Sequence, residues 1–296
     1  DKNGTIKKHQ LNISISDKDE IAPFNYVPSG DDPYSFATYS SITNNATPTI
    51  TGTAQANSTI TLLNGDIVLG NATADGEGAF SITPSAALAD GDYSLEAKAT
   101  DTAGNISSKS SSLSITIDTT APDAPTSLAT SSAITNNATP TITGTAEANS
   151  TITLLNGSVV IGTATADSEG DFSVTPSSAL ADGDYSLEAK ATDAAGNISS
   201  ESSSISITID TTAPNAPTSL VDISDTNDTT PTITGTAEAD STITLFNGNV
   251  VIGTATTDSE GDFSVTPSAA LAEGDYSLEA KATDAAGNIS SESSSM

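Results

Sequence analysis

Pro140-Thr-Ile-Thr-Gly-Thr-Ala146 is the stretch that decides the fold, because its alternation of apolar and hydroxyl-bearing residues is typical of a half-buried β-strand. The same seven residues begin at Pro48 and again at Pro231, at spacings of 92 and 91 residues. Other segments recur in the same order, among them Gly-Asp-Tyr-Ser-Leu-Glu-Ala-Lys-Ala-Thr-Asp. A repeat of this length is a whole small domain, so the sequence predicts three domains in tandem.

One repeat, residues 123–214, contains enough short strands for a two-layer domain. Seven segments of β-type composition follow one another in it, and none has the period of a helix. The expected fold class is therefore all-β, with tandem immunoglobulin-like antiparallel β-sandwiches. Gly183-Asp184-Tyr185 places a Tyr at the start of the sixth strand, where such sandwiches carry a tyrosine corner.

The repeat also sets the expected domain boundaries. Three Ig-like domains are expected, at residues 23–118, 119–210 and 211–296. Residues 1–22 are interpreted as the last strand of a preceding unit or as an N-terminal extension, because residues 11–15 resemble residues 113–117. The sequence stops at Met296, where domain 3 should begin its last strand, so that strand is either truncated or donated by another chain. We interpret the chain as part of a longer protein.

Charge and composition exclude several classes of partner. The chain carries 38 acidic residues against 8 basic ones, a net charge of -30. Such a surface repels the phosphates of nucleic acids and anionic lipids, so we expect no nucleic-acid partner. No apolar run reaches the roughly 18 residues of a membrane-spanning helix, so we expect no membrane insertion. The lack of Cys and the single His, His9, exclude thiolate sites, His-based triads and His metal centres.

Three motifs in a fixed order carry a family resemblance. They are Thr-Pro-Thr-Ile-Thr-Gly-Thr-Ala, Asp-Thr-Thr-Ala-Pro at 118–122 and 210–214, and Ala-Thr-Asp-Ala-Ala-Gly-Asn at 191–197. In this combination the chain resembles the bacterial Ig-like repeats of giant type I-secreted surface adhesins. The resemblance implies an elongated rod of domains that holds a terminal binding region away from the cell, with Ca²⁺ bound between and within domains. It also implies a secreted, cell-surface protein that serves adhesion and virulence.

The positions of the acidic residues give a separate reason to expect a cation at the junctions between domains. In a seven-stranded sandwich the incoming linker and alternate loops meet at one pole, and Ca²⁺ prefers six to eight oxygen ligands. The expected ligands at the first junction are Asp118, Asp193, Glu147 and Asp90 or Asp92. Those at the second are Asp210, Asp284, Glu238 and Asp182 or Asp184. Asp101, the counterpart of Asp193 in domain 1, is counted with them.

A second kind of calcium site is expected within the domains, in loops of the pattern Asp-x-Glu-Gly-Asp. Its expected ligands are Asp167, Glu169 and Asp171 in domain 2, and Asp258, Glu260 and Asp262 in domain 3. Domain 1 retains Asp75 and Glu77 but has Ala79 at the third position. The alternative for all of these acids is that polar loops carry them for solubility and to block pairing of sheet edges.

Two functions of different classes fit these features. The first is a non-catalytic, calcium-rigidified stalk segment of a bacterial surface adhesin, which spaces a terminal binding region from the cell. Its partners would be calcium ions, neighbouring repeats of the same chain, and a host-surface glycan or protein bound through other parts of the protein. The alternative is an Ig-like module that binds glycan or host protein through its loops and the aromatic segment 24–39. Paired acids such as Asp182 and Asp184 could resemble the catalytic carboxylates of a glycosidase. They recur in every unit, which suits a structural loop better, so we expect no enzyme activity.

Overall fold

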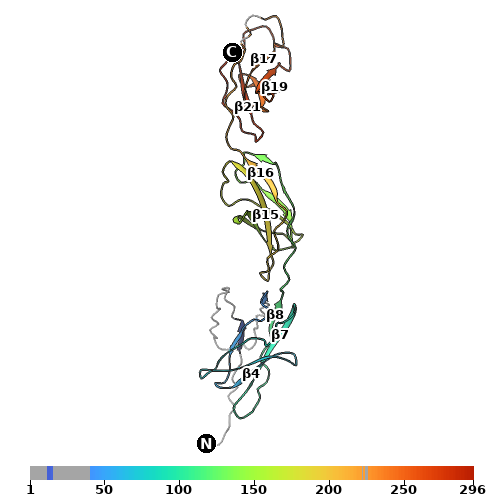
Figure 1. The fold of residues 1–296 in the computed structure, drawn as a ribbon, viewed down its shortest axis with the longest axis vertical. Helices are drawn as coiled ribbons and strands as arrows, with labels where there is room; N and C mark the ends of the chain where they lie inside the picture. Colours follow the sequence, from blue (N-terminus) through green and yellow to red (C-terminus); the bar gives the residue numbers. More distant parts are fainter. Residues whose placement is uncertain (1–11, 16–40, 222, 224–225) are drawn as a thin grey trace, which may run out of the picture. The chain divides into compact units, whose positions relative to one another are not determined.

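The computed structural model describes residues 12–15, 41–221, 223 and 226–296, and their regular secondary structure consists of strands (Figure 1). Among these residues there is no helix long and apolar enough to cross a membrane. The chain divides into two compact units. One comprises residues 1–122 together with 192–199, and the other comprises residues 123–191 and 200–296.

Domain 1 is a sandwich of a five-stranded and a three-stranded sheet. The strand orders are β2–β8–β7–β4–β5 and β1–β3–β6. The bounds of these strands are β1 (Asn12–Ile15), β2 (Ser41–Thr43), β3 (Ile50–Thr53), β4 (Thr59–Asn64), β5 (Ile67–Thr73), β6 (Ala79–Ile82), β7 (Gly91–Thr100) and β8 (Leu113–Ile117).

Domain 2 repeats this arrangement, with strand orders β10–β16–β15–β12–β13 and β14–β11–β9. Its strands are β9 (Thr126–Thr130), β10 (Ile134–Thr135), β11 (Ile142–Thr145), β12 (Thr151–Asn156), β13 (Val159–Thr165), β14 (Asp171–Val174), β15 (Gly183–Thr192) and β16 (Ile205–Ile209). The predicted two-sheet sandwich is confirmed. The sequence did not predict β10, a two-residue strand that pairs in parallel with β16 after the chain has crossed from one sheet to the other.

Domain 3 has sheets of order β19–β18–β21 and β17–β20. Its strands are β17 (Ile233–Thr236), β18 (Thr242–Asn247), β19 (Val250–Thr256), β20 (Asp262–Val265) and β21 (Leu278–Thr283). Thr218 forms an isolated bridge with Thr236 and so takes the position that β9 has in domain 2. Leu278 and Met296 exchange two main-chain hydrogen bonds of 3.0 and 3.2 Å, so Met296 occupies the start of the position of a last strand.

β1 pairs antiparallel with β3, with Ile15 opposite Ile50. β9 takes the same position against β11 in domain 2. Residues 12–15, which resemble the last strand of a unit, therefore lie in the position of a first strand of domain 1.

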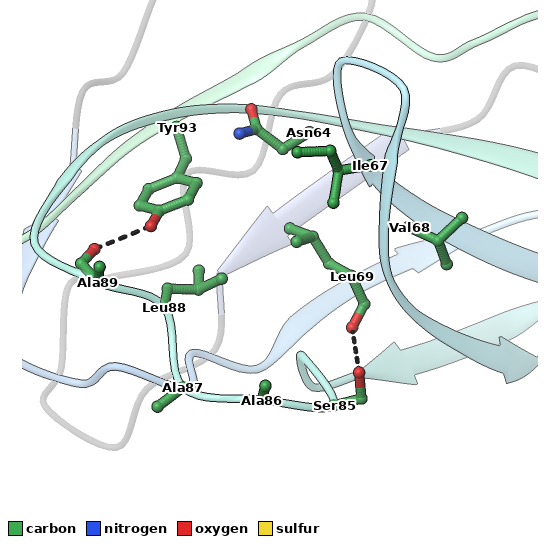
Figure 2. Close-up of a pocket in the computed structure, with 10 residues that line it drawn as sticks. All are labelled: Asn64, Ile67, Val68, Leu69, Ser85, Ala86, Ala87, Leu88, Ala89 and Tyr93. Carbon is green, nitrogen blue, oxygen red and sulfur yellow. Dashed lines mark hydrogen bonds between the residues drawn. The ribbon is translucent and has the colours of Figure 1, made fainter.

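Alternation along each strand builds the core, because every second side chain points between the sheets. In domain 2, Ile152, Leu154 and Leu187 are fully buried, and Phe172 is 5% exposed. The predicted tyrosine corner is present in all three domains. The hydroxyl of Tyr185 donates to the carbonyl of Ala181 at 2.9 Å, and Figure 2 shows the equivalent bond from Tyr93 to Ala89. Tyr276 donates to Ala272 in the same way.

Leu154 and Val160 lie on adjoining strands and test the division between core and surface. Leu154→Ala should lower the free energy of unfolding of domain 2 by about 2–5 kcal/mol, because the side chain is completely buried. Val160 is 56% exposed, and Val160→Ala should change the free energy of unfolding by no more than about 0.5 kcal/mol. Urea unfolding of the whole chain measures both, and equal effects of the two variants would contradict this description of the core.

Candidate functional site

The segment that follows the last strand of a domain is held by the loop before β7 or β15. In domain 1, Asp90 Oδ1 accepts hydrogen bonds from the main-chain amide and the hydroxyl of Thr119, at 2.9 and 2.8 Å. Its Oδ2 accepts a third bond from the hydroxyl of Thr120, at 2.7 Å. Asp182 makes the same three bonds with Thr211 and Thr212. The two threonines of the Asp-Thr-Thr motif therefore bind the domain whose last strand they follow.

These bonds lower the pKa of both carboxyl groups. The pKa of Asp90 lies below its ordinary value of 3.8, chiefly because of the hydroxyl of Thr120, followed by the hydroxyl and amide of Thr119. The pKa of Asp182 is lowered chiefly by the hydroxyl of Thr211, then by the hydroxyl of Thr212 and the amide of Thr211. In each case the donors stabilise the ionised form.

A loop of sequence Asp-Ala-Ala-Gly-Asn binds the same segment at Asp118. In this loop Asp193 Oδ1 accepts from the main-chain amide of Asn197 at 2.8 Å, and Oδ2 accepts from the Asn197 side-chain amide at 2.7 Å. The side-chain amide of Asn197 also donates to the main-chain carbonyl of Asp118 at 2.8 Å. The loop turns at Gly196, whose φ of +93° favours glycine. The carboxylate thus orients the Asn that binds the linker.

Two main-chain hydrogen bonds complete this arrangement. The amide of Asp118 donates to the carbonyl of Thr43 at 3.0 Å, and the amide of Asn44 donates to the carbonyl of Ala195 at 3.2 Å. We call Thr43, Asn44, Asp118 and the loop 193–197 the first linker clamp. All of its residues belong to the compact unit that contains domain 1.

The second linker clamp repeats these contacts and consists of Thr135, Asn136, Asp210 and the loop 284–288. Asn288 donates from its side chain to the carbonyl of Asp210 at 2.8 Å, and Asn136 donates from its main chain to Ala286 at 3.2 Å. The amide of Asp210 donates to Thr135 at 3.0 Å. All of these residues lie within the other compact unit.

The asparagines of the clamps were not predicted from the sequence. A signal for them existed, because Ile-Thr-Asn-Asn-Ala-Thr-Pro occurs at 42–48 and again at 134–140. Such a run also fits an ordinary polar turn, and its role depends on the short parallel strands β2 and β10 that precede Asn44 and Asn136.

The structure brings only part of the expected junction set together. Asp118 and Asp193 are linked through Asn197, and Asp210 and Asp284 through Asn288. Asp92 and Asp184 instead accept hydroxyl hydrogen bonds within their own sheets, from Thr116 and Thr208 at 2.6 Å. The side chains of Glu147 and Glu238 are exposed, on loops whose carbonyls accept bonds from Ser150 and Ser241.

In the expected loop sites, the first Asp binds main-chain amides of its own loop. Asp167 Oδ1 accepts the amides of Glu169 and Asp171, both at 2.9 Å. Asp258 does the same with Glu260 and Asp262. Asp75 accepts the amides of Glu77 and Ala79, so the loop keeps its shape in domain 1 although its third acid is absent. The first Asp of each loop therefore organises it, while the remaining acidic side chains are exposed.

Within the described ranges, no group of three or more Asp, Glu, His or Cys side chains is arranged to hold a metal ion. The oxygen donors that are present are nevertheless of the hard type that Ca²⁺ prefers. A carboxylate offers about four acceptor positions, so the hydrogen bonds above do not use all of them. The calcium ligands expected from the sequence stay a prediction.

Domain 1 also has a shallow apolar hollow of about 310 Å³ beside the β4–β5 hairpin (Figure 2). Ile67, Val68 and Leu69 line it on the hairpin, and Leu88 and Tyr93 face them. Ile67 and Val68 are more than half exposed, as are the equivalent Val pairs of the other domains. The aromatic segment 24–39, on which the alternative binding function depended, lies outside the described residues.

Comparisons with known proteins agree with the repeat. A family model described as a bacterial Ig-like domain matches residues 35–119, 121–211 and 222–296. No curated protein sequence matches. The solved structures that are similar include a tetra-tandem repeat in the extending region of a large adhesion protein, at 28% identity over 85% of this chain and 70% of that one, with a TM-score of 0.27.

Two further solved structures are more distant. Fibronectin(III)-like modules of CbhA from Clostridium thermocellum are 16% identical over 67% of this chain and 94% of theirs, with a TM-score of 0.39. The BSP domain of a biofilm-associated protein is 15% identical over 84% of this chain and 62% of that one, with a TM-score of 0.25.

The hydrogen bonds to Asp182 predict a pH dependence of the linker. Because the folded-state pKa lies below the ordinary value of 3.8, ionised Asp182 stabilises the bound linker above about pH 4. This stabilisation is lost as the pH falls through the lowered pKa. An NMR titration of the Asp182 carboxyl carbon should give a midpoint below 3.8, and Thr211→Val with Thr212→Val should raise it towards that value. A wild-type midpoint at or above 3.8 would contradict the proposed role of the threonines.

Proposed function

Because the chain belongs to the bacterial Ig-like domain family, we propose that it is a non-catalytic spacer segment of a large bacterial cell-surface adhesin. In this role the chain holds a terminal binding region away from the cell, and that region attaches to a host or another surface. The proposal places the protein outside the cell, where its partners are neighbouring repeats of the same chain. A host glycan or protein would be bound through other parts of the adhesin.

The observation that carries this proposal is the repetition of the linker clamp. The two clamps use the same residue types, and their corresponding hydrogen bonds have the same lengths, 2.8, 3.0 and 3.2 Å. A module that recognises a ligand needs one specific surface, whereas a spacer needs the same connection at every junction. Repeated connections let the reach of a protein grow with the number of domains.

The composition supports an extracellular spacer as well. A net charge of -30 keeps such a chain soluble and discourages lateral association. Within the described residues, salt bridges join Lys109, Lys190 and Lys281 to Glu96, Glu201 and Glu292, and none of them uses an acid of the linker clamps or of the Asp-x-Glu-Gly-Asp loops. The charge therefore faces solvent at the loops.

Small-angle scattering tests the spacer function through its consequence for shape. A compact protein of 296 residues has a radius of gyration of roughly 19 Å. Three domains arranged in line over about 100 Å should give roughly 30 Å. A value near that of a compact protein, for the full chain at physiological salt, would contradict the spacer.

We also propose that Ca²⁺ stiffens this spacer. The loop acids Glu260 and Asp262 of domain 3, and Glu169 and Asp171 of domain 2, are exposed oxygen donors in short loops that Asp258 and Asp167 already shape. At the second junction, the proposed ligands are Asp210, Asp284 and Glu238, with Asp182 or Asp184. The corresponding ligands of the first junction are Asp118, Asp193 and Glu147, with Asp90 or Asp92. A bound cation would also reduce the repulsion among these acids.

Calorimetry with and without Ca²⁺ tests this second step. Ligand binding to the folded state should raise its stability by about 2.7 kcal/mol when the free calcium is 100 times the Kd, and EDTA should reverse the gain. Glu260→Gln combined with Asp262→Asn should remove the contribution of the domain 3 loop while leaving Asp258 to hold the main chain. Identical melting in EDTA and in calcium would refute calcium binding without affecting the spacer proposal.

A further inference from the structure

We propose that the Asp-Ala-Ala-Gly-Asn loop is a binding site for the main chain of the preceding repeat, and that hydrogen bonds from the loop hold this connection. The side-chain amide of the Asn captures the carbonyl of the linker Asp. The second linker clamp, which lies within one compact unit, is the basis of the argument. The inference does not depend on the adhesin or on calcium.

Asn288 is the residue that makes the connection specific. Its side-chain amide has two N–H donors, and it donates both to Asp284 Oδ2 and to the carbonyl of Asp210, each at 2.8 Å. Asn288 and Asp210 are 78 residues apart in sequence and both are half-buried. A main-chain carbonyl in such a position needs a donor, and Asn288 supplies one.

Asp284 is a positioning residue for Asn288. Its two carboxylate oxygens accept the main-chain and side-chain amides of Asn288, both at 2.8 Å, and so fix the direction of the side chain. The main-chain amide of Asp284 is held in place as well, because it donates to the carbonyl of Asn288 at 3.1 Å. The loop therefore presents its free Asn N–H in one orientation before the linker arrives.

Domain 1 supports this preorganisation. Asp101 and Asn105 form the same two bonds, both at 2.8 Å, although Asn105 is exposed whereas Asn197 and Asn288 are half-buried. The loop thus has its binding conformation also where its Asn is open to solvent. An interaction with little left to order on binding loses less conformational entropy.

The loop also offers a hydrogen-bond acceptor, so it both donates to domain 2 and accepts from it. The carbonyl of Ala286 accepts the amide of Asn136, while the amide of Asp210 donates to Thr135 on the same corner of domain 2. Asp210 is thereby bound through both its amide and its carbonyl. At the first clamp, Asn197 donates to the carbonyl of Asp118 at 2.8 Å, and the amide of Asn44 donates to the carbonyl of Ala195 at 3.2 Å, in the same way.

Amide hydrogen exchange of the full chain in EDTA tests the proposal. Asn288→Ala removes the donor to Asp210, and the amides of Asn136 and Asp210 should exchange about three- to tenfold faster as the clamp opens more often. The amide of Ala280 is bound to Ser293 inside domain 3 and should be unaffected. Residual dipolar couplings should fit one alignment frame for domains 2 and 3 in the wild type and two frames in the variant.

Three further variants serve as comparisons. Asn288→Asp keeps the size of the side chain but removes its N–H donors, and it should accelerate exchange at Asn136 at least as much as Asn288→Ala. Ala285→Ser changes an exposed residue of the same loop and should leave the exchange of Asn136 at the wild-type rate. Asn105→Ala removes the equivalent Asn of domain 1 and should also leave Asn136 unchanged.

Each alternative outcome would overturn the proposal. Unchanged exchange of Asn136 in both Asn288 variants would show that Asn288 does not hold the linker. Equal acceleration at Ala280 and Asn136 would show that Asn288 serves the fold of domain 3 instead. Separate alignment frames for domains 2 and 3 in the wild type in EDTA would show that the hydrogen bonds of the clamp do not hold the two domains together.

Discussion

Hydrogen bonds from amides to the carboxylates of loop aspartates are the interaction on which this structure depends. The strands are rich in Ser and Thr and bury only a modest set of Ile, Leu, Val and Ala side chains. The loops therefore need their own source of order. Asp167, Asp193 and their equivalents supply it by accepting two main-chain or side-chain amides each, as ionised side chains do well. Fixed loops then allow weakly apolar domains to be joined in a defined way.

The sequence predicted the sandwich well because its information is local. A period of two and a Tyr at the start of the sixth strand each report directly on strands that are close in sequence. Strand β10 escaped because Ile134-Thr135 is too short to show alternation. Its parallel pairing with β16 joins residues more than 70 positions apart, which no local pattern reveals.

The prediction of the site was less complete for a chemical reason. A carboxylate in a loop accepts a cation, a hydroxyl or an amide with the same oxygens, and sequence spacing does not distinguish between them. The acids of the joints were therefore located, but the donors that bind them were not. Thr119, Thr211, Asn197 and Asn288 fill those roles, and they belong to the polar residue types that are common in any turn. Only the fold shows that they face a linker.

Each repeat is a domain that carries two halves of a connection, one for each of its neighbours. One half is the Thr-Asn corner, in which the Thr hydroxyl accepts the amide two residues on, at Thr43, Thr135 and Thr226 alike. The other half is the Asp-to-Asn loop, with corresponding internal bonds of 2.7 to 2.8 Å at Asp101, Asp193 and Asp284. Because each half holds its own shape, a corner of one repeat suits the loop of any other. A gain or loss of whole repeats would therefore leave the chemistry of every remaining joint intact, whereas a change in either half must be tolerated at each joint where it occurs.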